Sequence, residues 1–473
     1  MTQTPVGHVP VPAGEAPGTA GGGPDSGHLR RAAAAHLRSL RAGAATEPGR
    51  LRVVGAVLAL LIVAFGAVTA WQVADRQAAA GNVLDHSAPL SANAAAIYRS
   101  LADADATVAD GFLAGGQEPA DVVDKYQDDV TTAARLIAEA AANSAGSPQA
   151  RAQINTLSSQ LPAYTQLVAT ARAYNRLGLP LGGAYLRYAD QRMRQDGGLL
   201  DAASRLYTAE NARLGSDYTD AKDLPYASWA LGVATLAALA WAQRRHYRRT
   251  NRVFNRGLLS ASAATAVVLL WLAAAHTVAR TDLEDSAAHG ARSTRVLDNA
   301  QIVLLQARGD ENLALVARGV DTSYDTRFTT AMTTLAGPEN GPLGGELAQA
   351  LKLADDPRGK APVLAAADAV AQWRVRHAAE LRLDGEGRYD EAVSKVIGGK
   401  DAQGEDIAST KQNFQAADNA LDSAIRQEQG EFQAAASDGR DALDLLPYGA
   451  GGLALAAAAC AVLGIGRRLA EYR

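Results

Sequence analysis

The densest cluster of reactive side chains is a short segment with six arginines and no acidic residue. It spans residues 244–256 and holds Arg244, Arg245, Arg248, Arg249, Arg252 and Arg256. Guanidinium groups bind carboxylates and phosphates through paired hydrogen bonds, which suits them to an acidic protein partner or an anionic lipid surface. A second interpretation needs no partner, because arginines in a short loop beside a membrane helix also fix the orientation of that helix.

A second group of side chains could recognise a small ligand. It lies within residues 174–187 and consists of Tyr174, Asn175, Arg176, Tyr185 and Arg187, interspersed with glycines. An arginine beside exposed backbone amides can hold a carboxylate, and the tyrosines could form the walls of a pocket. The same residues are also compatible with a tight turn between two helices.

A third group combines an indole, an imidazole and two guanidinium groups. Trp373 and His377 are four residues apart and therefore share a helix face. Arg374 and Arg382 accompany them. These residues could form a recognition site, but a core tryptophan flanked by solvated arginines explains them equally well.

No catalytic motif accompanies these groups. The sequence has no glycine-rich phosphate loop, His-Glu-x-x-His motif or nucleophile elbow, and its eight histidines are dispersed. The single cysteine, Cys460, excludes a cysteine-based metal cluster. The acids between Asp121 and Asp129 predict a solvated helix face, because a helix presents carboxylates along a line rather than around an ion. We therefore expect a protein that is not an enzyme and has no metal or cofactor.

Four apolar blocks determine where these groups lie. Residues 53–74, 224–243, 257–279 and 445–466 contain no Asp, Glu, Lys or Arg. A bilayer core of about 30 Å needs roughly 20 helical residues, and each block meets that length. The sequence therefore predicts four membrane-spanning helices. Because no charged side chain lies within them, a transporter is disfavoured.

The distribution of charge predicts the orientation. Segments 1–52, 244–256 and 467–473 together carry a net charge of +11, whereas segments 75–223 and 280–444 together carry −15. Short segments rich in Lys and Arg stay in the cytoplasm, while long ones cross largely regardless of charge. We expect a multi-pass protein of the plasma membrane with both termini and the arginine loop in the cytoplasm, and with both long segments outside.

The three cytoplasmic pieces are small. Residues 1–27 are rich in Gly, Pro and Ala, which predicts disorder. Residues 28–42 form a basic amphipathic pattern that could lie on anionic lipid or act as a simple tether. Together the pieces are too short and divided to form a kinase or cyclase domain.

Both long outer segments show helical patterns throughout. The apolar residues Ile97, Leu101, Ala104, Val108 and Phe112 are spaced 4, 3, 4 and 4, as in a bundle helix. Glycine and proline breakers predict helices over 76–114, 120–143, 149–176 and 183–222, in an up-down-up-down four-helix bundle. In the second segment a heptad pattern from Ile407 to Ala424 predicts a similar bundle. The predicted fold class is an all-α integral membrane protein with two extracytoplasmic helical bundles.

The order of basic flank, span, outer segment, span and basic flank occurs twice, at 50–249 and 252–473. A constant offset along the chain places Leu101 on Leu304 and Ala104 on Ala307. Such repetition predicts an internal duplication.

Paired helical bundles anchored in a membrane resemble the sensory modules of bacterial chemoreceptors and histidine kinases. The turn from Arg176 to Arg187, the following Met193 and the segment from Gly385 to Tyr389 resemble actinobacterial GlnX-type four-span membrane proteins. That family relays amino-acid availability from GlnH, a lipoprotein that binds glutamate and aspartate, to the cytoplasmic Ser/Thr kinase PknG. The resemblance implies the same two kinds of partner here, with the arginine loop as the evident counterpart of a kinase contact.

We therefore expect a signal-transducing receptor whose partners are membrane lipids, a solute-binding lipoprotein and a cytoplasmic Ser/Thr kinase. The sequence also allows a homo-oligomer, and it gives no reason to expect nucleic acid. Two alternatives remain, namely a chemosensor that binds a small molecule directly and a cell-envelope scaffold that does not signal.

Overall fold

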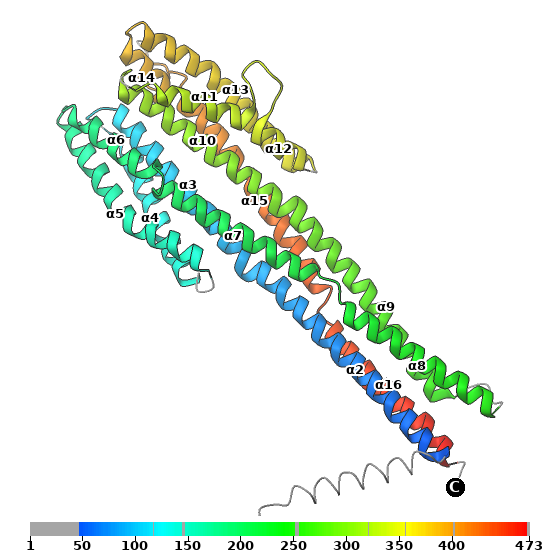
Figure 1. Cartoon of the computed structure of the whole chain (residues 1–473). Helices are drawn as coiled ribbons and strands as arrows, with labels where there is room; N and C mark the ends of the chain where they lie inside the picture. The colour runs from blue at the N-terminus through cyan, green and yellow to red at the C-terminus, as the bar shows by residue number, and fades with distance from the viewer. Residues whose placement is uncertain are drawn as a thin grey trace, which may run out of the picture. The chain divides into compact units, whose positions relative to one another are not determined.

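The computed structural model describes residues 47–116, 118–143, 147–250, 255–319, 321–354, 356–400 and 403–470. Its α-helices and two π-helical segments (η) follow one another along the chain as shown in Figure 1. Their bounds are α2 Glu47–Asn82, η1 Val83–Ser87, α3 Ala88–Leu113, α4 Ala120–Asn143, α5 Pro148–Arg176, α6 Leu181–Arg194, α7 Leu199–Lys222, α8 Tyr226–Thr250, α9 Arg256–Asp285, η2 Ser286–Ala291, α10 Arg292–Ala317, α11 Ser323–Ala336, α12 Gly345–Leu353, α13 Pro357–Gly385, α14 Tyr389–Ile397, α15 Thr410–Asp441 and α16 Leu446–Ala470. These described residues form no strand, so the all-α prediction is confirmed. The predicted disordered segment 1–27 and basic segment 28–42 lie outside them.

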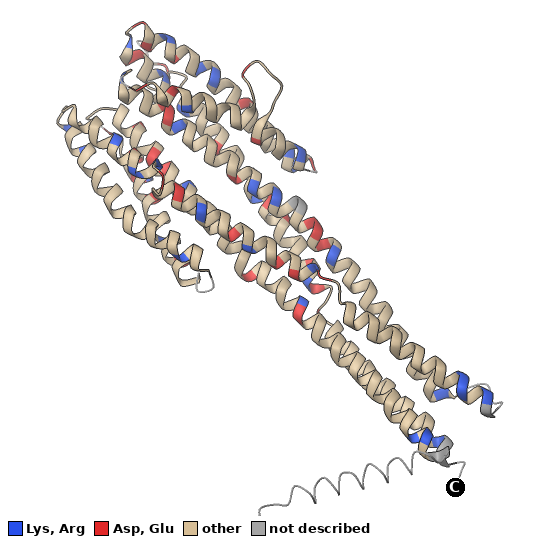
Figure 2. Ribbon diagram, in the orientation of Figure 1, with Lys and Arg blue, Asp and Glu red and all other residues tan. Residues whose placement is uncertain are grey.

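Among the described residues, four stretches of helix are long and apolar enough to cross a membrane. They are Gly49–Leu113, Leu181–Arg248, Arg256–Asp285 and Thr410–Arg467, and each contains one of the four apolar blocks. Figure 2 shows uncharged stretches along α2, α8, α9 and α16, with Lys and Arg near helix ends. The prediction of four membrane-crossing helices is confirmed, whereas their orientation stays a prediction.

The chain divides into two compact units, each of which is considered by itself. The described residues of the first are 47–63, 234–250, 255–265 and 454–470, and those of the second lie within 64–233 and 266–453. The first unit has a small apolar core to which all four membrane helices contribute. Its members include Leu58, Ile62, Leu239, Ala242, Leu258, Ala261, Ala457 and Ala461.

Two glycines bring α9 and α16 together in the first unit. A Cβ atom on Gly257 would lie 2.4 Å from the carbonyl oxygen of Cys460 and 2.6 Å from the Cα of Gly464. Helices in lipid associate through such close contacts between small residues, because burial of apolar surface gives little advantage there.

We expect Gly257→Ala to destabilise this contact, because the obstructing atoms belong to the backbone and cannot rotate away. Overpacking of this kind costs about 1–3 kcal/mol. The purified protein in detergent should therefore unfold at a lower temperature. Gly466→Ala on α16 is the matched control, since nothing lies within 4 Å of its Cβ position. Equal unfolding temperatures for the two variants would contradict the contact.

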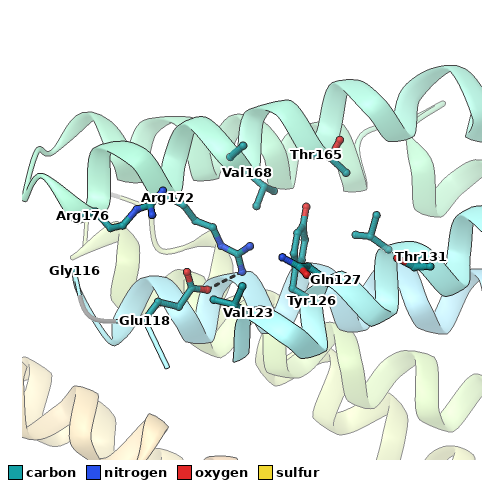
Figure 3. Close-up of a pocket in the computed structure, with 12 residues that line it drawn as sticks. Gly116, Glu118, Val123, Tyr126, Gln127, Thr131, Thr165, Val168, Arg172 and Arg176 are labelled. Atoms are coloured by element: carbon teal, nitrogen blue, oxygen red, sulfur yellow. Dashed lines mark hydrogen bonds and ion pairs between the residues drawn. The ribbon is translucent and has the colours of Figure 1, made fainter. Parts of the chain in front are cut away.

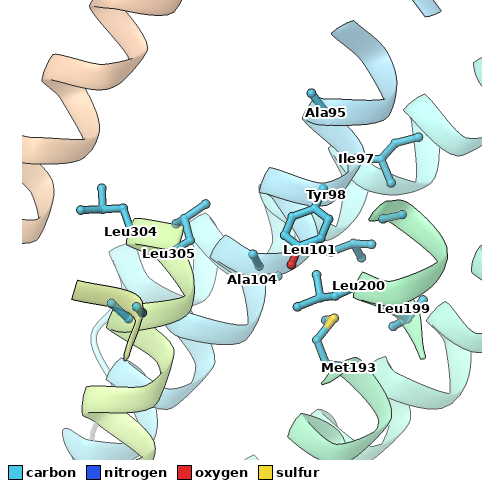
Figure 4. Packing of buried hydrophobic residues seen from close by; sticks show 14 of the residues in the cluster. Ala95, Ile97, Tyr98, Leu101, Ala104, Met193, Leu199, Leu200, Leu304 and Leu305 are labelled. Atoms are coloured by element: carbon cyan, nitrogen blue, oxygen red, sulfur yellow. The ribbon is translucent and has the colours of Figure 1, made fainter. Parts of the chain in front are cut away.

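The second unit contains two helical bundles. Bundle 1 consists of α3, α4, α5, α6 and α7, and bundle 2 consists of α10, α11, α12, α13, α14 and α15. Helices α3 and α10 pack against each other, so the two bundles contribute to one continuous apolar core, here called the shared core. Figure 4 shows part of it, with Ile97 and Leu101 of α3, Leu199 of α7 and Leu304 of α10. The two predicted outer domains therefore share their interior.

The predicted apolar stripe of α3 lies in the shared core. Ile97, Leu101, Ala104 and Val108 are at most 2% exposed, and Phe112 is partly buried against the same core. Full burial of a large aliphatic side chain stabilises the fold by about 1.5–3 kcal/mol, so this stripe accounts for the packing of α3. The α10 residues at the corresponding positions of the predicted repeat, among them Leu304 and Ala307, are buried as well. The duplication itself stays a prediction.

Two details of the predicted helices are wrong. The single helix predicted over 183–222 is divided into α6 and α7, because Gly197 adopts a positive φ of 73° and a Cβ on Gly198 would lie 2.7 Å from the Arg192 carbonyl. Ile407 precedes α15 instead of belonging to it, since the helix begins after a capping box formed by Ser409 and Gln412.

The helix leading into each bundle contains a π-helical segment that the sequence analysis missed. Val83 begins η1 and Ser286 begins η2, and the same offset that places Leu101 on Leu304 relates these two residues. Ser286 is buried, and its Oγ lies 2.6 Å from the hydroxyl of Tyr218 on α7. It also donates a hydrogen bond to the carbonyl oxygen of Phe432 on α15. Both bundles therefore meet at η2.

Candidate functional site

A run of polar residues on α10 lies in the interior of the second unit. Arg308, Asp310, Glu311 and Asn312 are each at most 2% exposed. A buried charge without partners is strongly destabilising, so these groups require partners nearby. The partners come from both bundles, because this part of α10 faces α3. We call the set the polar network; its members are Asp105, Asp110, Asp190, Arg194, Arg308, Asp310, Glu311, Asn312, Trp373 and His377.

Arg308 is the arginine that bundle 2 contributes to the polar network, and we call it the bundle 2 centre. Its guanidinium donates hydrogen bonds to Asp110 Oδ1 on α3 at 2.6 Å, to Glu311 Oε2 at 2.7 Å and to Thr410 Oγ1 at 3.0 Å. Asn312 donates a second hydrogen bond to Asp110 Oδ1, also at 2.6 Å. Asp110 is thus held by two donors from the opposite bundle, which fixes α3 against α10.

Glu311 connects α10 to α13. It accepts a hydrogen bond from Trp373 Nε1 at 2.8 Å and lies 3.1 Å from His377 Nδ1. Burial tends to raise the pKa of Glu311, but the hydrogen bond from His377 and the charge of Arg308 outweigh it and lower that pKa. Burial also opposes the charge of His377, yet hydrogen bonds to Glu311 and Glu380 raise its pKa to about 9. The imidazole is therefore protonated at neutral pH.

Arg194 is the last residue of α6. It is the arginine that bundle 1 contributes to the polar network, and we call it the bundle 1 centre. Its guanidinium lies 3.3 Å from Asp105 Oδ2, 2.8 Å from Asp190 Oδ1 and 3.1 Å from Asp310 Oδ1. A Cβ on Gly309 would collide with Arg194 Nη2, so a larger residue there would displace this guanidinium. The two bundles thus exchange ion pairs. Arg194 of bundle 1 binds Asp310 of bundle 2, and Arg308 of bundle 2 binds Asp110 of bundle 1.

Asp105 gives the polar network a group that can change its charge near neutral pH. Burial, reinforced by the charge of Asp190, raises the pKa of Asp105 to about 7, although Arg194 acts in the opposite direction. Tyr164 of α5 donates a hydrogen bond to Asp105 Oδ1 at 3.4 Å. The polar network can therefore hold the bundles in one register and respond to a change at α5.

Two of the four residues predicted around Trp373 belong to the polar network. Trp373 is fully buried and His377 is 6% exposed, so they face the core rather than a surface ligand. Arg374 donates hydrogen bonds to the carbonyl oxygens of Met332 and, at 2.7 Å, Gly337, and thereby holds the end of α11. Arg382 is exposed. The structure does not gather these four side chains into one pocket.

Of the five residues predicted around the turn from α5 to α6, the structure brings the two tyrosines together and gives Asn175, Arg176 and Arg187 other surroundings. The rings of Tyr174 and Tyr185 stack at 5.4 Å, and the Arg187 guanidinium lies beside Gly183. The amide of Asn175 donates hydrogen bonds to the carbonyl oxygens of Phe112 and Gly115, so it ties the end of α5 to α3. Arg176 is exposed and lines a different cavity, between α4 and α5.

The arginine loop lies at the junction of α8 and α9. Arg244 and Arg248 are exposed on α8, and Arg245 lies over the ring of Trp241 at 5.4 Å. Arg249 belongs to the last turn of α8, and Arg256 is the exposed first residue of α9. Arg252 lies outside the described residues.

The sequence analysis missed both arginine centres, although a signal for one of them was available. Leu304, Arg308, Glu311 and Leu315 are spaced 4, 3 and 4, which is the apolar spacing of a bundle helix. Two ionised residues at core positions of one such helix indicate a buried ion pair. Arg194 gave no comparable signal, because it ends a short helix whose boundary was not predicted.

The shared core and the four apolar helices define the class as an all-α membrane protein with two helical bundles in its second unit. Residues 79–219 match the family model described as the actinobacterial sensor domain. The match extends from the end of α2 into the last turn of α7 and so covers nearly all of bundle 1. No curated protein matches the chain, and no solved structure does. The sensor-domain match and the four apolar helices fit a multi-pass membrane sensor.

Proposed function

We propose that this protein is a transmembrane signal transducer that relays the extracellular availability of glutamate or aspartate to a cytoplasmic Ser/Thr kinase. A solute-binding lipoprotein presents the amino acid to the outer bundles. The observation that carries the sensing role is the actinobacterial sensor-domain match over residues 79–219, in a chain with four apolar helices. The amino-acid ligand and the two partners follow from the resemblance to GlnX-type proteins.

In this proposal both termini and the arginine loop are cytoplasmic, and the two bundles are outside. The difference between +11 on the short segments and −15 on the long ones supports this orientation. Arg244, Arg245 and Arg248 then lie on the cytoplasmic side, where guanidinium groups can bind acidic side chains of a kinase.

The polar network supports a role in relaying a change from one bundle to the other. A partner that docks on bundle 1 acts on α6 and α3, which hold Arg194, Asp105 and Asp110. Arg194–Asp310 and Arg308–Asp110 connect these helices directly to α10. Packed interfaces of this kind tend to have discrete arrangements that differ by helix shifts of about 1–2 Å. Docking would favour one arrangement of the two bundles.

The second candidate is a chemosensor that binds a small molecule directly. A cavity of ≈660 Å³ between α4 and α5, inside the matched sensor domain, favours this alternative.

The proposal is tested by replacing Arg244, Arg245, Arg248 and Arg249 with alanine. We expect the variant to lose recruitment of the kinase, measured by cross-linking in cells and identification of the captured proteins. It should also lose the intracellular response to external glutamate. If recruitment and response persist unchanged, the loop serves only to orient the membrane helices.

A variant with lysine at the same four positions is the matched control for orientation, because it keeps the positive charge of the loop. Protease accessibility in intact cells should show both bundles outside for this variant and for the original sequence. A shielded bundle in the original sequence would contradict the receptor proposal.

A further inference from the structure

A cavity with its own polar groups lies between α4 and α5. Its volume is ≈660 Å³, within the range of about 300–1,000 Å³ that is usual for small-molecule sites. Figure 3 shows Glu118, Tyr126, Arg172 and Arg176 around it. Apolar side chains such as Val123, Val130 and Val168 complete the lining.

Three of the polar groups are held in a fixed arrangement. Arg172 Nη2 lies 2.7 Å from Glu118 Oε1, and the two side chains are only 17% and 14% exposed. The Arg172 guanidinium also lies over the ring of Tyr126, 4.3 Å from its centre. A Cβ on Gly111 would lie 2.2 Å from Glu118 Oε1, so the glycine of α3 makes room for this carboxylate. The charged groups are therefore positioned before any ligand arrives.

Two buried donors in this arrangement have no acceptor. Neither the hydroxyl of Tyr126 nor Nε of Arg172 has a hydrogen-bond partner among the described residues, although both atoms are buried. Buried donors are paired in the great majority of cases, and an unpaired one calls for a specific explanation. Tyr126 is only 7% exposed, and its ring stands between the two helices in Figure 3. Burial raises the pKa of Tyr126 to about 12, so its hydroxyl stays a donor at physiological pH.

Arg176 adds a free cation at the edge of the cavity. It is exposed and forms no side-chain hydrogen bond or ion pair with the part of the chain that the structure describes. The cavity thus offers guanidinium donors and a phenol for a carboxylate, one carboxylate for an ammonium group, and apolar walls between them.

We infer that the cavity between α4 and α5 binds a free α-amino acid, with its carboxylate at Arg176, Arg172 and Tyr126 and its ammonium group at Glu118. The inference rests on the proposed sensing function in its second form, the chemosensor that binds a small molecule directly, and it names the ligand class and the residues of that site. An α-amino acid carries a carboxylate and an ammonium group close together, which suits the adjacent guanidinium of Arg172 and carboxylate of Glu118. Its side chain lies along the valines.

The position of the site also explains how occupancy reaches the polar network. Arg172 and Arg176 belong to α5, and the same helix supplies Tyr164, whose hydroxyl bonds to Asp105. Tyr164 is fully buried, so a movement of α5 acts directly on Asp105.

The test is a thermal-shift screen of the full-length protein in lipid nanodiscs against the twenty standard L-amino acids, followed by calorimetry on those that stabilise it. Succinate, which lacks the ammonium group, and putrescine, which lacks the carboxylate, should bind at least about tenfold more weakly than the best amino acid. Arg176→Gln and Tyr126→Phe should each weaken its binding by about tenfold. Both substitutions remove groups that have no partner among the described residues, so the fold should tolerate them.

Arg151→Gln is the matched control, because Arg151 is an exposed residue near the other end of α5. The inference is overturned if no amino acid stabilises the protein, or if the Arg176 and Tyr126 variants bind as the Arg151 variant does. The proposed relay is a separate matter. It is still supported if the cells respond to external glutamate and the response requires the solute-binding lipoprotein. If cells with the original protein give no intracellular response to external glutamate, the proposed function itself is contradicted.

Discussion

Replacing Arg308 by methionine is expected to lower the free energy of unfolding of the shared core by about 3–5 kcal/mol. The change removes the only guanidinium that bonds to both Asp110 and Glu311 among the described residues, so each of these carboxylates loses a charged partner in the interior. The Glu311 side chain is completely buried, so water cannot replace the lost donor. Urea unfolding of the full chain in detergent measures the effect.

The chain offers a probe at the site of the change. Trp373 is the only tryptophan outside the predicted membrane spans, and its indole donates to Glu311. A background with phenylalanine at Trp71, Trp229, Trp241 and Trp271 leaves this indole as the single fluorescent reporter.

Arg426→Met is the control for the first prediction. Arg426 pairs with Asp422 on the same helix, α15, but the two side chains are 64% and 45% exposed. Exposed pairs contribute about 0–1 kcal/mol, so this variant should unfold close to the original. Adding Asp110→Asn to the Arg308 variant should recover part of the lost free energy of unfolding, because it removes a carboxylate whose guanidinium partner is gone. Equal stability of the Arg308 and Arg426 variants would show that the polar network does not hold the bundles together.

Replacing Arg194 by methionine is expected to destabilise the shared core by a similar amount, about 3–5 kcal/mol, at pH 8 and by less at pH 6. The pKa of Asp105 is about 7 in the folded protein, above the value of 3.8 for a free side chain. Folding is therefore favoured by a proton on Asp105 at low pH, and this contribution is lost as the pH rises through about 7. Without Arg194 the folded pKa rises further, so the difference between variant and original grows with pH. Urea unfolding at pH 6, 7 and 8 checks this.

The matched control for Arg194 is Arg205→Met in the neighbouring helix α7. Arg205 pairs with Asp201, and its side chain is 62% exposed. We expect a small effect with no trend between pH 6 and pH 8. A loss in the Arg194 variant that stays constant over this range would rule out Asp105 as the titrating group.

Much of the fold could be predicted from the sequence because apolar spacing is a local property. Ile97, Leu101 and Ala104 repeat with the period of a helix, and all three are fully buried. The predicted helix over 120–143 agrees with α4 in both bounds, because Pro119 precedes it. The break at Gly197 was missed for a different reason, since glycines inside a helical pattern often continue the helix at a modest cost.

The candidate site could be predicted only in part because it depends on contacts between distant segments. Trp373 and His377 were correctly placed on one helix face, but their common partner Glu311 lies on a different helix, far earlier in the chain. Nothing near Arg194 indicates that its guanidinium reaches Asp310 on α10. Pairing of this kind follows from the packing of α3 on α10, which helical periodicity alone does not specify.

The segments η1 and η2 have a mechanical consequence. A π-helical segment forms where one extra residue is inserted into a turn of an α-helix. One residue corresponds to about 100° of rotation about the helix axis. Moving or expelling that residue would therefore twist one flank of the helix against the other while most backbone hydrogen bonds re-form. The same element occurs in the helix that enters each bundle, and Ser286 in the second copy is bonded to both bundles. The helix that enters each bundle can therefore twist about its axis at its π-helical segment, η1 in one and η2 in the other.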